Sequence, residues 1–289
     1  MILKDKKYAF LFLAPALTLI TVFLFNPLIQ TFYFSLTDWH NFSMKKTFIG
    51  LENYQRLLQD PVVGIAIKNT LLLILLCIIF EIGFALLLAM LIDGVKRGFK
   101  IYRTVFFFPV VVSGSAIGLL FALTYQYDAG LLNNILGVFG MSKVMWLTEK
   151  SSALLSMMPY IWQMTGFYFV IFMTALTKIP SDIYESAALD GVTGFSKSIY
   201  ITLPLIRDVI ITTIALVITS AIKVFDIIFT ITQGGPMNSS QVLSTYIYQT
   251  TFQSMNQGYG SALSILMVVI GIGLTIITTL MSRKEPISY

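Results

Sequence analysis

Six long segments that carry almost no charge restrict the fold of this chain more than any other feature. They span approximately residues 8–36, 65–92, 104–127, 152–177, 205–232 and 259–282. A helix needs about 20 mostly apolar residues to cross the hydrocarbon core of a bilayer. Of the 289 residues, 56% are hydrophobic and 11% are charged, which lies outside the range of soluble domains. The sequence predicts an all-α integral membrane protein, with a single domain of six transmembrane helices over residues 1–289.

The distribution of lysine and arginine predicts how these spans are oriented. If the N-terminus is cytosolic, twelve basic residues lie in cytosolic segments, six lie outside, and Lys223 lies within a span. Basic residues accumulate on the cytosolic side, so both termini and the segment 178–204 are expected there. The net charge of +5 fits an anionic inner leaflet and requires no nucleic acid. The first segment is too long for the apolar part of a signal peptide, so we expect a retained span.

The scarcity of reactive side chains excludes several classes of enzyme. The chain has one histidine, His40, in an expected outer loop, and one cysteine, Cys77, within a span. An intramembrane zinc protease needs clustered ligands, and an intramembrane serine protease needs a facing serine and histidine. The GxxxxGK[ST] phosphate-binding loop is absent from the sequence. We therefore expect no catalytic residues, no metal site and no ATP hydrolysis by this chain.

The segment between the fourth and fifth spans contains the signals of a short helix. Pro180 suits a first helical turn, Ser181 or Asp182 can cap it, and Gly191 suits the left-handed residue that ends a helix. A second short helix is expected over about residues 195–200. A helix of about ten residues is marginal in water without packing. The helix either packs on the protein's own bundle or docks to another protein, and the residues alone do not decide between the two.

The spacing over residues 185–204 resembles the EAA motif of ABC-importer permeases, which reads Glu-Ala-Ala, three residues, Gly, nine residues, Ile-x-Leu-Pro. The matching residues are Glu185, Ser186, Ala187, Gly191, Ile201, Leu203 and Pro204, with Ser186 as the one departure. In that family the loop is a coupling helix that inserts into the ATPase subunit. The resemblance implies an ATPase contact made by Glu185, Ser186, Ala187, Ala188, Asp190 and Gly191. In this contact Ala187 and Ala188 would form the close-packed face, and Gly191 would make the turn.

Other segments resemble the carbohydrate-uptake, or maltose-type, branch of these permeases. They include FIGLENYQRLLQDP followed by Lys68, Asn69 and Thr70, then ITQGGPMNSSQVLSTYIYQTTF, and GYGSALSILM. Pro15, Pro27 and Trp39 match the pattern of the first span in that branch. The resemblance covers nearly the whole chain. It implies a type I importer fold, similar to the maltose permease, in a bacterial inner membrane.

The resemblance also implies partners. They are a second homologous permease, a dimer of ATPase subunits that binds ATP and Mg²⁺, an extracellular solute-binding protein, membrane lipid and a carbohydrate such as an oligosaccharide or sugar derivative. The chain itself would bind no cofactor and would form half of the translocation pathway. Two alternatives are a permease of the same class for a non-sugar solute and an ATP-independent carrier, in which the cytosolic helix is only structural.

Polar side chains at membrane depth are candidates for that pathway. Lys223 and Asp226 are spaced i, i+3 on the fifth span, so they are expected to share a face and to be able to pair, either on the pathway or as a neutralised structural pair. Tyr160 and Gln163 share a face of the fourth span and either line a sugar path or make interhelical contacts. Glu81 has no partner in its own helix, and we expect an interhelical hydrogen bond.

The expected outer loop over residues 233–258 carries no charge. Its amide, hydroxyl and aromatic side chains are Gln233, Asn238, Ser239, Gln241, Tyr246, Tyr248, Gln249, Gln253 and Asn256. Such groups suit the hydrogen bonds and ring stacking that a neutral sugar requires. An ordinary polar loop at the membrane interface is the alternative.

Overall fold

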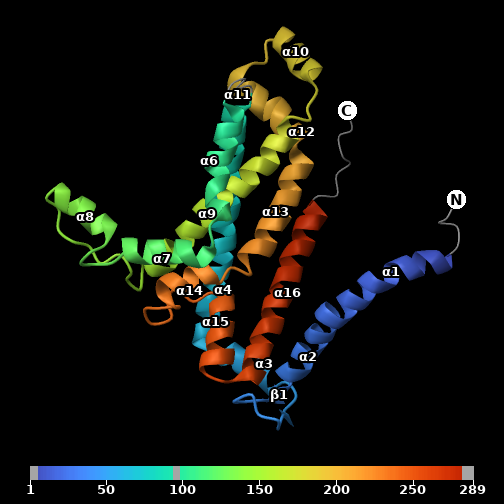
Figure 1. Ribbon diagram of the computed structural model, residues 1–289, viewed down its shortest axis with the longest axis vertical. Helices are drawn as coiled ribbons and strands as arrows, with labels where there is room; N and C mark the ends of the chain where they lie inside the picture. Colours follow the sequence, from blue (N-terminus) through green and yellow to red (C-terminus); the bar gives the residue numbers. More distant parts are fainter. Residues whose placement is uncertain (1–5, 94–97, 282–289) are drawn as a thin grey trace. The chain divides into compact units, whose positions relative to one another are not determined.

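The computed structural model describes residues 6–93 and 98–281, and nearly all of its regular elements are helices (Figure 1). The α-helices are α1 (Lys6–Ile20), α2 (Asn26–Ser35), α3 (Glu52–Gln59), α4 (Pro61–Leu76), α5 (Gly83–Ile92), α6 (Phe99–Val111), α7 (Gly114–Thr124), α8 (Leu131–Val138), α9 (Ser152–Leu176), α10 (Ser181–Leu189), α11 (Gly194–Lys197), α12 (Leu203–Leu205), α13 (Arg207–Ala221), α14 (Asp226–Thr232), α15 (Leu243–Tyr248) and α16 (Gln257–Met281). Stretches of π-helix continue several of them: η2 (Thr21–Phe25), η3 (Cys77–Ile82), η4 (Ser198–Thr202) and η5 (Gln249–Gln253). Two short strands, β1 (Thr37–Asp38) and β2 (Thr47–Phe48), form an antiparallel hairpin.

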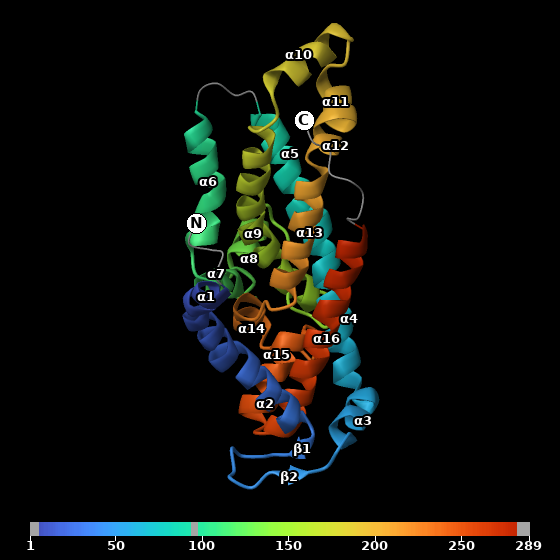
Figure 2. The ribbon, with the colours of Figure 1, turned by 90° about the vertical axis from the view of Figure 1, so that its right-hand side faces the viewer.

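The chain divides into two compact units. The first comprises Met1–Pro61 and Ile247–Val268, and the second comprises Val62–Tyr246 and Val269–Tyr289. In the second unit α9 is the central helix, because it contacts α5, α6, α7, α13, α14 and η3. Figure 2 shows α6, α9 and α13 side by side. Tyr168, Phe169 and Phe172 of α9 are at most 1% exposed, so the core of this unit lies around them.

Four helices in the described part of the chain are long and apolar enough to cross a membrane. They are Phe12–Ser35, Pro61–Ile92, Ser152–Leu176 and Gln257–Leu280, which match the predicted first, second, fourth and sixth spans. Two bent helix pairs supply the rest: Lys100–Val111 with Gly114–Thr124 at 86°, and Gly194–Leu205 with Arg207–Ala221 at 71°. Counting each pair as one span confirms the predicted architecture of six spans. The prediction of continuous third and fifth helices is wrong.

The third span breaks between α6 and α7 for local reasons. Pro109 has no N–H to donate within α6, which weakens the helix two residues before its end at Val111. Val112 and Ser113 are extended, and the Ser113 hydroxyl accepts a hydrogen bond from the Ala116 N–H at 3.3 Å. This is an N-cap, which begins α7 in a new direction.

The predicted fifth span, residues 205–232, is broken twice. The chain bends at Ile206, so α13 begins at Arg207. The helix α13 ends at Ala221. Residues 222–225 form no helix, and α14 begins at Asp226. The helix α14 then packs on α7 (Figure 1).

The crossing of α7 and α14 depends on Gly118. A Cβ atom at this position would lie 2.8 Å from the Thr230 Cβ and 3.2 Å from the Ile227 carbonyl oxygen. Glycine therefore lets the two backbones approach closely, as small residues do between membrane helices.

We expect Gly118→Val to lower the apparent unfolding temperature of the purified protein, because the added methyl groups force α7 and α14 apart. Overpacking of this kind costs about 1–3 kcal/mol. The matched control is Gly137→Val in α8, where a Cβ would meet nothing within 4 Å. The difference in unfolding temperature is measured by heating both variants in detergent and quantifying the remaining folded protein by size-exclusion chromatography. Equal unfolding temperatures for the two variants would contradict the packing described.

Candidate functional site

The helix α10 carries the first residues of the EAA-like motif, Glu185, Ser186 and Ala187, and it lies beside α11 at one end of the second unit (Figure 2). It ends in a Schellman motif. Gly191 has φ +78°, its N–H donates to the Ala188 carbonyl at 3.1 Å, and the Val192 N–H donates to the Ala187 carbonyl at 2.9 Å. The turn predicted at Gly191 is present, and a residue with a Cβ would be strained there.

The beginning of α10 differs from the prediction. Pro180 is the N-cap, just before the helix, and no side chain caps the first turn. The Ser181 hydroxyl bonds the neighbouring Asp182 carboxylate at 3.3 Å instead. The free N–H groups of the first turn are therefore not satisfied by the side chains expected from the sequence.

Most of the expected coupling residues are on the exposed side of this loop. Glu185, Ser186, Ala188, Asp190 and Gly191 are exposed. Ala187, in contrast, is 6% exposed and packs against its own chain. The two alanines were expected to form one outer face, but their side chains point to different sides of the helix. Of the two, only Ala188 is on the exposed side.

Three large apolar side chains in the same loop were not singled out from the sequence. Leu189, Phe195 and Tyr200 are 90%, 80% and 74% exposed. Exposed apolar groups in a segment that also carries charges are typical of a contact surface. A large apolar residue in a short segment that is otherwise polar was the sequence signal that could have identified these three side chains.

A groove of about 570 Å³ lies between this loop and the last turns of α5. It is lined by Leu87, Met90, Leu91, Tyr184, Ala188, Val192, Thr193, Gly194, Phe195, Lys197 and Ser198. The Lys197 ammonium lies 4.4 Å from the centre of the Tyr184 ring, and the Tyr184 and Thr202 hydroxyls are 3.4 Å apart. These contacts join α10 to α11 and η4.

The predicted pairing of Lys223 with Asp226 is wrong. Lys223 lies in the irregular segment after α13, and Asp226 is the first residue of α14. Within residues 6–93 and 98–281 neither side chain forms an ion pair, and both are exposed. The i, i+3 spacing brings two side chains together only on a continuous helix, and the helix is interrupted between them.

Asp226 has a different neighbour. Its carboxylate lies against Gly114, so closely that a Cβ at this position would overlap it. Gly114 is the first residue of α7, where backbone N–H groups have no partner within the helix. A carboxylate is favoured at this end by the helix dipole. The start of α14 therefore lies close to the start of α7 at this point.

Tyr160 and Gln163 are both buried, at 6% and 4% exposure. The Gln163 amide donates to the Val112 carbonyl at 2.8 Å, which is the carbonyl at the break between α6 and α7. Gln163 therefore supports the bend of the third span.

Residues 240–243 of the loop predicted to meet a sugar are buried. Gln241 is 1% exposed, and the Asn69 amide donates to the carbonyls of Ser239 and Gln241, both at 2.8 Å. The Ser152 and Ser239 hydroxyls are 2.9 Å apart. These contacts tie the loop to α4 and α9, and they leave Gln233 as an exposed amide at its start.

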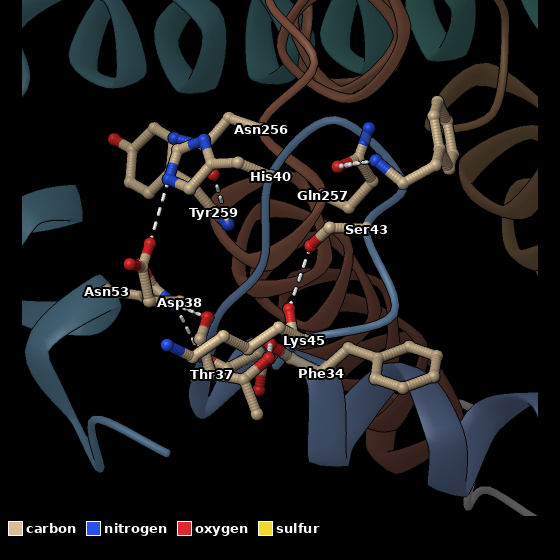
Figure 3. A network of polar contacts seen from close by, with 12 residues as sticks. Phe34, Thr37, Asp38, His40, Ser43, Lys45, Asn53, Asn256, Gln257 and Tyr259 are labelled. Atoms are coloured by element: carbon tan, nitrogen blue, oxygen red, sulfur yellow. Dashed lines mark hydrogen bonds and ion pairs between the residues drawn. The ribbon is translucent and has the colours of Figure 1, made fainter. Parts of the chain in front are cut away.

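A polar network holds the first unit together (Figure 3). The His40 side chain pairs with the Asp38 carboxylate at 2.8 Å, and the Asn53 amide donates to the Thr37 carbonyl at 3.0 Å. The Phe42 N–H donates to the Gln257 amide oxygen at 3.1 Å. The network joins the β-hairpin to α3 and to the start of α16.

Comparison with known proteins identifies the family. The family described as the inner membrane component of binding-protein-dependent transport systems matches residues 81–285. The chain belongs to this family. A probable ABC transporter permease protein of Bacillus subtilis is 34% identical over 281 residues, which cover 96% of each chain. The trehalose/maltose transport system permease protein of Thermococcus litoralis is 31% identical over 275 residues, covering 95% of this chain and 93% of the relative.

A solved structure shares the fold of this inner membrane component. It is a chain of a bacterial alginate ABC transporter in complex with an alginate pentasaccharide-bound periplasmic protein. The TM-score is 0.83 at 25% identity, and the match covers 96% of this chain and 94% of the other. The likeness confirms the predicted type I importer permease fold, which rested on the EAA spacing and the outer segments.

We expect Gln163→Leu to destabilise the bend between α6 and α7, because it leaves the carbonyl of the half-buried Val112 without this donor. Such a loss costs about 1–3 kcal/mol. The matched control is Gln126→Leu, at an exposed glutamine. Hydrogen exchange of residues 110–116 should become faster in Gln163→Leu only. Unchanged exchange would show that the Gln163 amide does not hold the bend.

Proposed function

We propose that this permease is half of the translocation pathway of an ATP-driven importer for a carbohydrate, an oligosaccharide or a sugar derivative. The observation that carries the proposal is the exposed helix α10 between α9 and α13, which holds Glu185, Ser186 and Ala187 of the motif and ends in the turn at Gly191. The sugar assignment is supported by the relatives, whose names include diacetylchitobiose, lactose and trehalose/maltose transport. No charged residue is found in the sequence of the loop 233–258, which suits a neutral substrate.

The proposed complex contains a second homologous permease, two ATPase subunits and an extracellular solute-binding protein. ATP and Mg²⁺ would be bound by the ATPase subunits and not by this chain. The excess of basic residues in segments 96–103 and 178–207 supports a cytosolic position for both termini and for α10.

In this complex α10 is the contact with the ATPase. Its nine residues are too few to be stable alone in water, and its exposed Leu189 would be covered by a partner. Glu185, Ala188 and Asp190 are on the accessible side. Lys223 and Asp226, exposed at the break of the fifth span, are the polar residues that we assign to the pathway.

Glu185→Lys is expected to reduce sugar uptake by about tenfold or more, the effect of losing roughly 1.4 kcal/mol at the docking contact. The side chain is exposed, so the variant should insert and remain folded. The matched control is Glu149→Lys, at an exposed glutamate between α8 and α9. Uptake into proteoliposomes and co-purification of the ATPase measure the two consequences. Normal uptake without any ATPase in the preparation would favour an ATP-independent carrier.

The substrate class is tested with the reconstituted complex and its solute-binding protein. ATP hydrolysis should rise when the binding protein is loaded with one member of a panel of mono- and oligosaccharides. A panel of amino acids and phosphodiesters is the control. A response to one of these solutes and to no sugar would refute the carbohydrate assignment and leave the importer assignment standing.

A further inference from the structure

Two features of the second unit are explained neither by its spans nor by the loop of α10 to α12. One is Glu81 in η3, which is 0% exposed and has no hydrogen-bond partner within residues 6–93 and 98–281, so the interhelical hydrogen bond expected from the sequence is absent. The other is α8, which lies outside the candidate spans and yet has large apolar side chains on its surface. Apolar surface outside a span indicates a partner that removes it from water.

The exposed apolar side chains of α8 share one side of the helix. Leu131, Ile135 and Val138 are spaced i, i+4, i+7, and Phe139 follows at i+8. These four residues, which are 45–85% exposed, form the apolar face of α8. Asn133, on the other side of the helix, is 2% exposed. Figure 1 shows α8 on a loop that extends away from the rest of the second unit, and no described residue covers its apolar face.

The side-chain amide of Asn133 fixes the shape of this loop. Its N–H groups donate to the carbonyls of Tyr127 and Val144, both at 2.9 Å. Its oxygen accepts from the Val144 N–H at 3.0 Å and from the Trp146 indole N–H at 3.1 Å. The loop is therefore held together by polar contacts on the inner side of α8, and the apolar face is a defined outward surface.

Charges bound the loop but are absent from its middle. The sequence contains no aspartate, glutamate, lysine or arginine over residues 129–142, and Asp128 and Lys143 at the two ends of this segment pair at 3.3 Å. Taking a charge out of water is costly at membrane depth. The segment that carries the apolar face can leave water without that cost.

The neighbouring helices show which surroundings α8 meets. The helix α7 belongs to the bent third span, and its exposed Leu119, Leu120 and Leu123 form an apolar side that precedes the apolar face of α8 in the chain. It turns by 86° from α6, so it lies at a large angle to the spanning direction, and α8 packs on it. The chain then enters α9, a span, at Ser152. Because α9 crosses the membrane, the loop of α8 before it and α10 after it lie at opposite faces of the membrane.

The composition of the apolar face favours lipid over a protein partner. The residues that dominate protein interfaces are enriched in Trp, Tyr and Arg, whereas Leu and Val are under-represented among them. The apolar face of α8 consists of three aliphatic side chains and one phenylalanine, with no polar group. Tyr127 and Trp146 stand at the two ends of the loop, and such rings are enriched where protein crosses from water into lipid.

We propose that α8 is an interfacial helix whose apolar face lies among the acyl chains of the leaflet opposite α10. Its inner side, with Asn133, remains at the level of the lipid headgroups. The helix thereby fixes the depth of α7 in the membrane, and with it the crossing of α7 and α14. The inference goes beyond the proposed function, because it depends on the membrane and on neither the sugar nor the ATPase.

Spin-label accessibility in the whole complex, reconstituted in vesicles of phosphatidylethanolamine and phosphatidylglycerol, tests this position. A nitroxide is attached to Val138→Cys on the apolar face, with the cysteines of the other subunits replaced. Cys77, the one cysteine of this chain, is 0% exposed and is not labelled. The label collides with oxygen, which concentrates in hydrocarbon, and with a water-soluble nickel chelate. The matched control is Gly137→Cys on the other side of α8, where a Cβ would meet nothing within 4 Å.

The ratio of oxygen to nickel collisions should be several-fold higher at residue 138 than at residue 137, and Leu131→Cys, on the same face, should repeat the result. A ratio at residue 138 that is equal to or below that at residue 137 would place the apolar face in water and overturn the proposal. A label at residue 138 that is immobilised and reached by neither reagent would show a protein contact, which also overturns it. Since the measurement needs neither transport nor ATP, a complex that imports no sugar would refute the proposed function and leave this test intact.

Discussion

The requirement that backbone carbonyls in a membrane find a hydrogen-bond donor determines how this permease is built. A continuous helix meets the requirement by itself, but the third and fifth spans are broken. At the first break the Gln163 amide donates to the Val112 carbonyl, and at the second the Ser244 hydroxyl donates to the Val224 carbonyl. Each break is therefore tied to a helix elsewhere in the second unit, α9 in one case and α15 in the other. The breaks are fixed in position because their carbonyls have no alternative partner in hydrocarbon.

The same breaks explain where the charges of the fifth span lie. A lysine and an aspartate on a continuous apolar helix would both need a partner at membrane depth. Here the helix ends before Lys223, and Asp226 begins α14 with its carboxylate against the start of α7. The absence of a Cβ at Gly114 allows this close approach, and the dipole of α7 favours a negative charge at its start. Lys223 and Asp226 are both exposed, so neither charge is buried in the protein interior.

The sequence contains the signals for the spans and for α10, but not for the contacts that connect them. Apolar length predicts a span because desolvation is summed over many residues, and Gly191 predicts a helix end because few other residues adopt its φ. A hydropathy window does not detect the breaks, because it averages the hydropathy of Ser113 and Lys223 with that of their apolar neighbours. For the first break, however, Pro109 and Ser113 were a local signal in the sequence. The burial of Gln163 and Gln241 could not be derived from spacing. Their partners, Val112 and the Asn69 amide, lie 51 and 172 residues away.

The connection from α10 to the membrane depends on how rigid the intervening loop is. A short helix on a flexible tether would move without displacing the spans. The Schellman turn at Gly191, the Lys197–Tyr184 contact and the Tyr184–Thr202 hydroxyl contact instead join α10, α11 and η4 over both arms of the loop. Beyond η4 there are only α12 and the bend at Ile206 before α13 begins, and Ile206 is 2% exposed, so the bend is itself packed. In the proposed complex a displacement of α10 is therefore transmitted to α13.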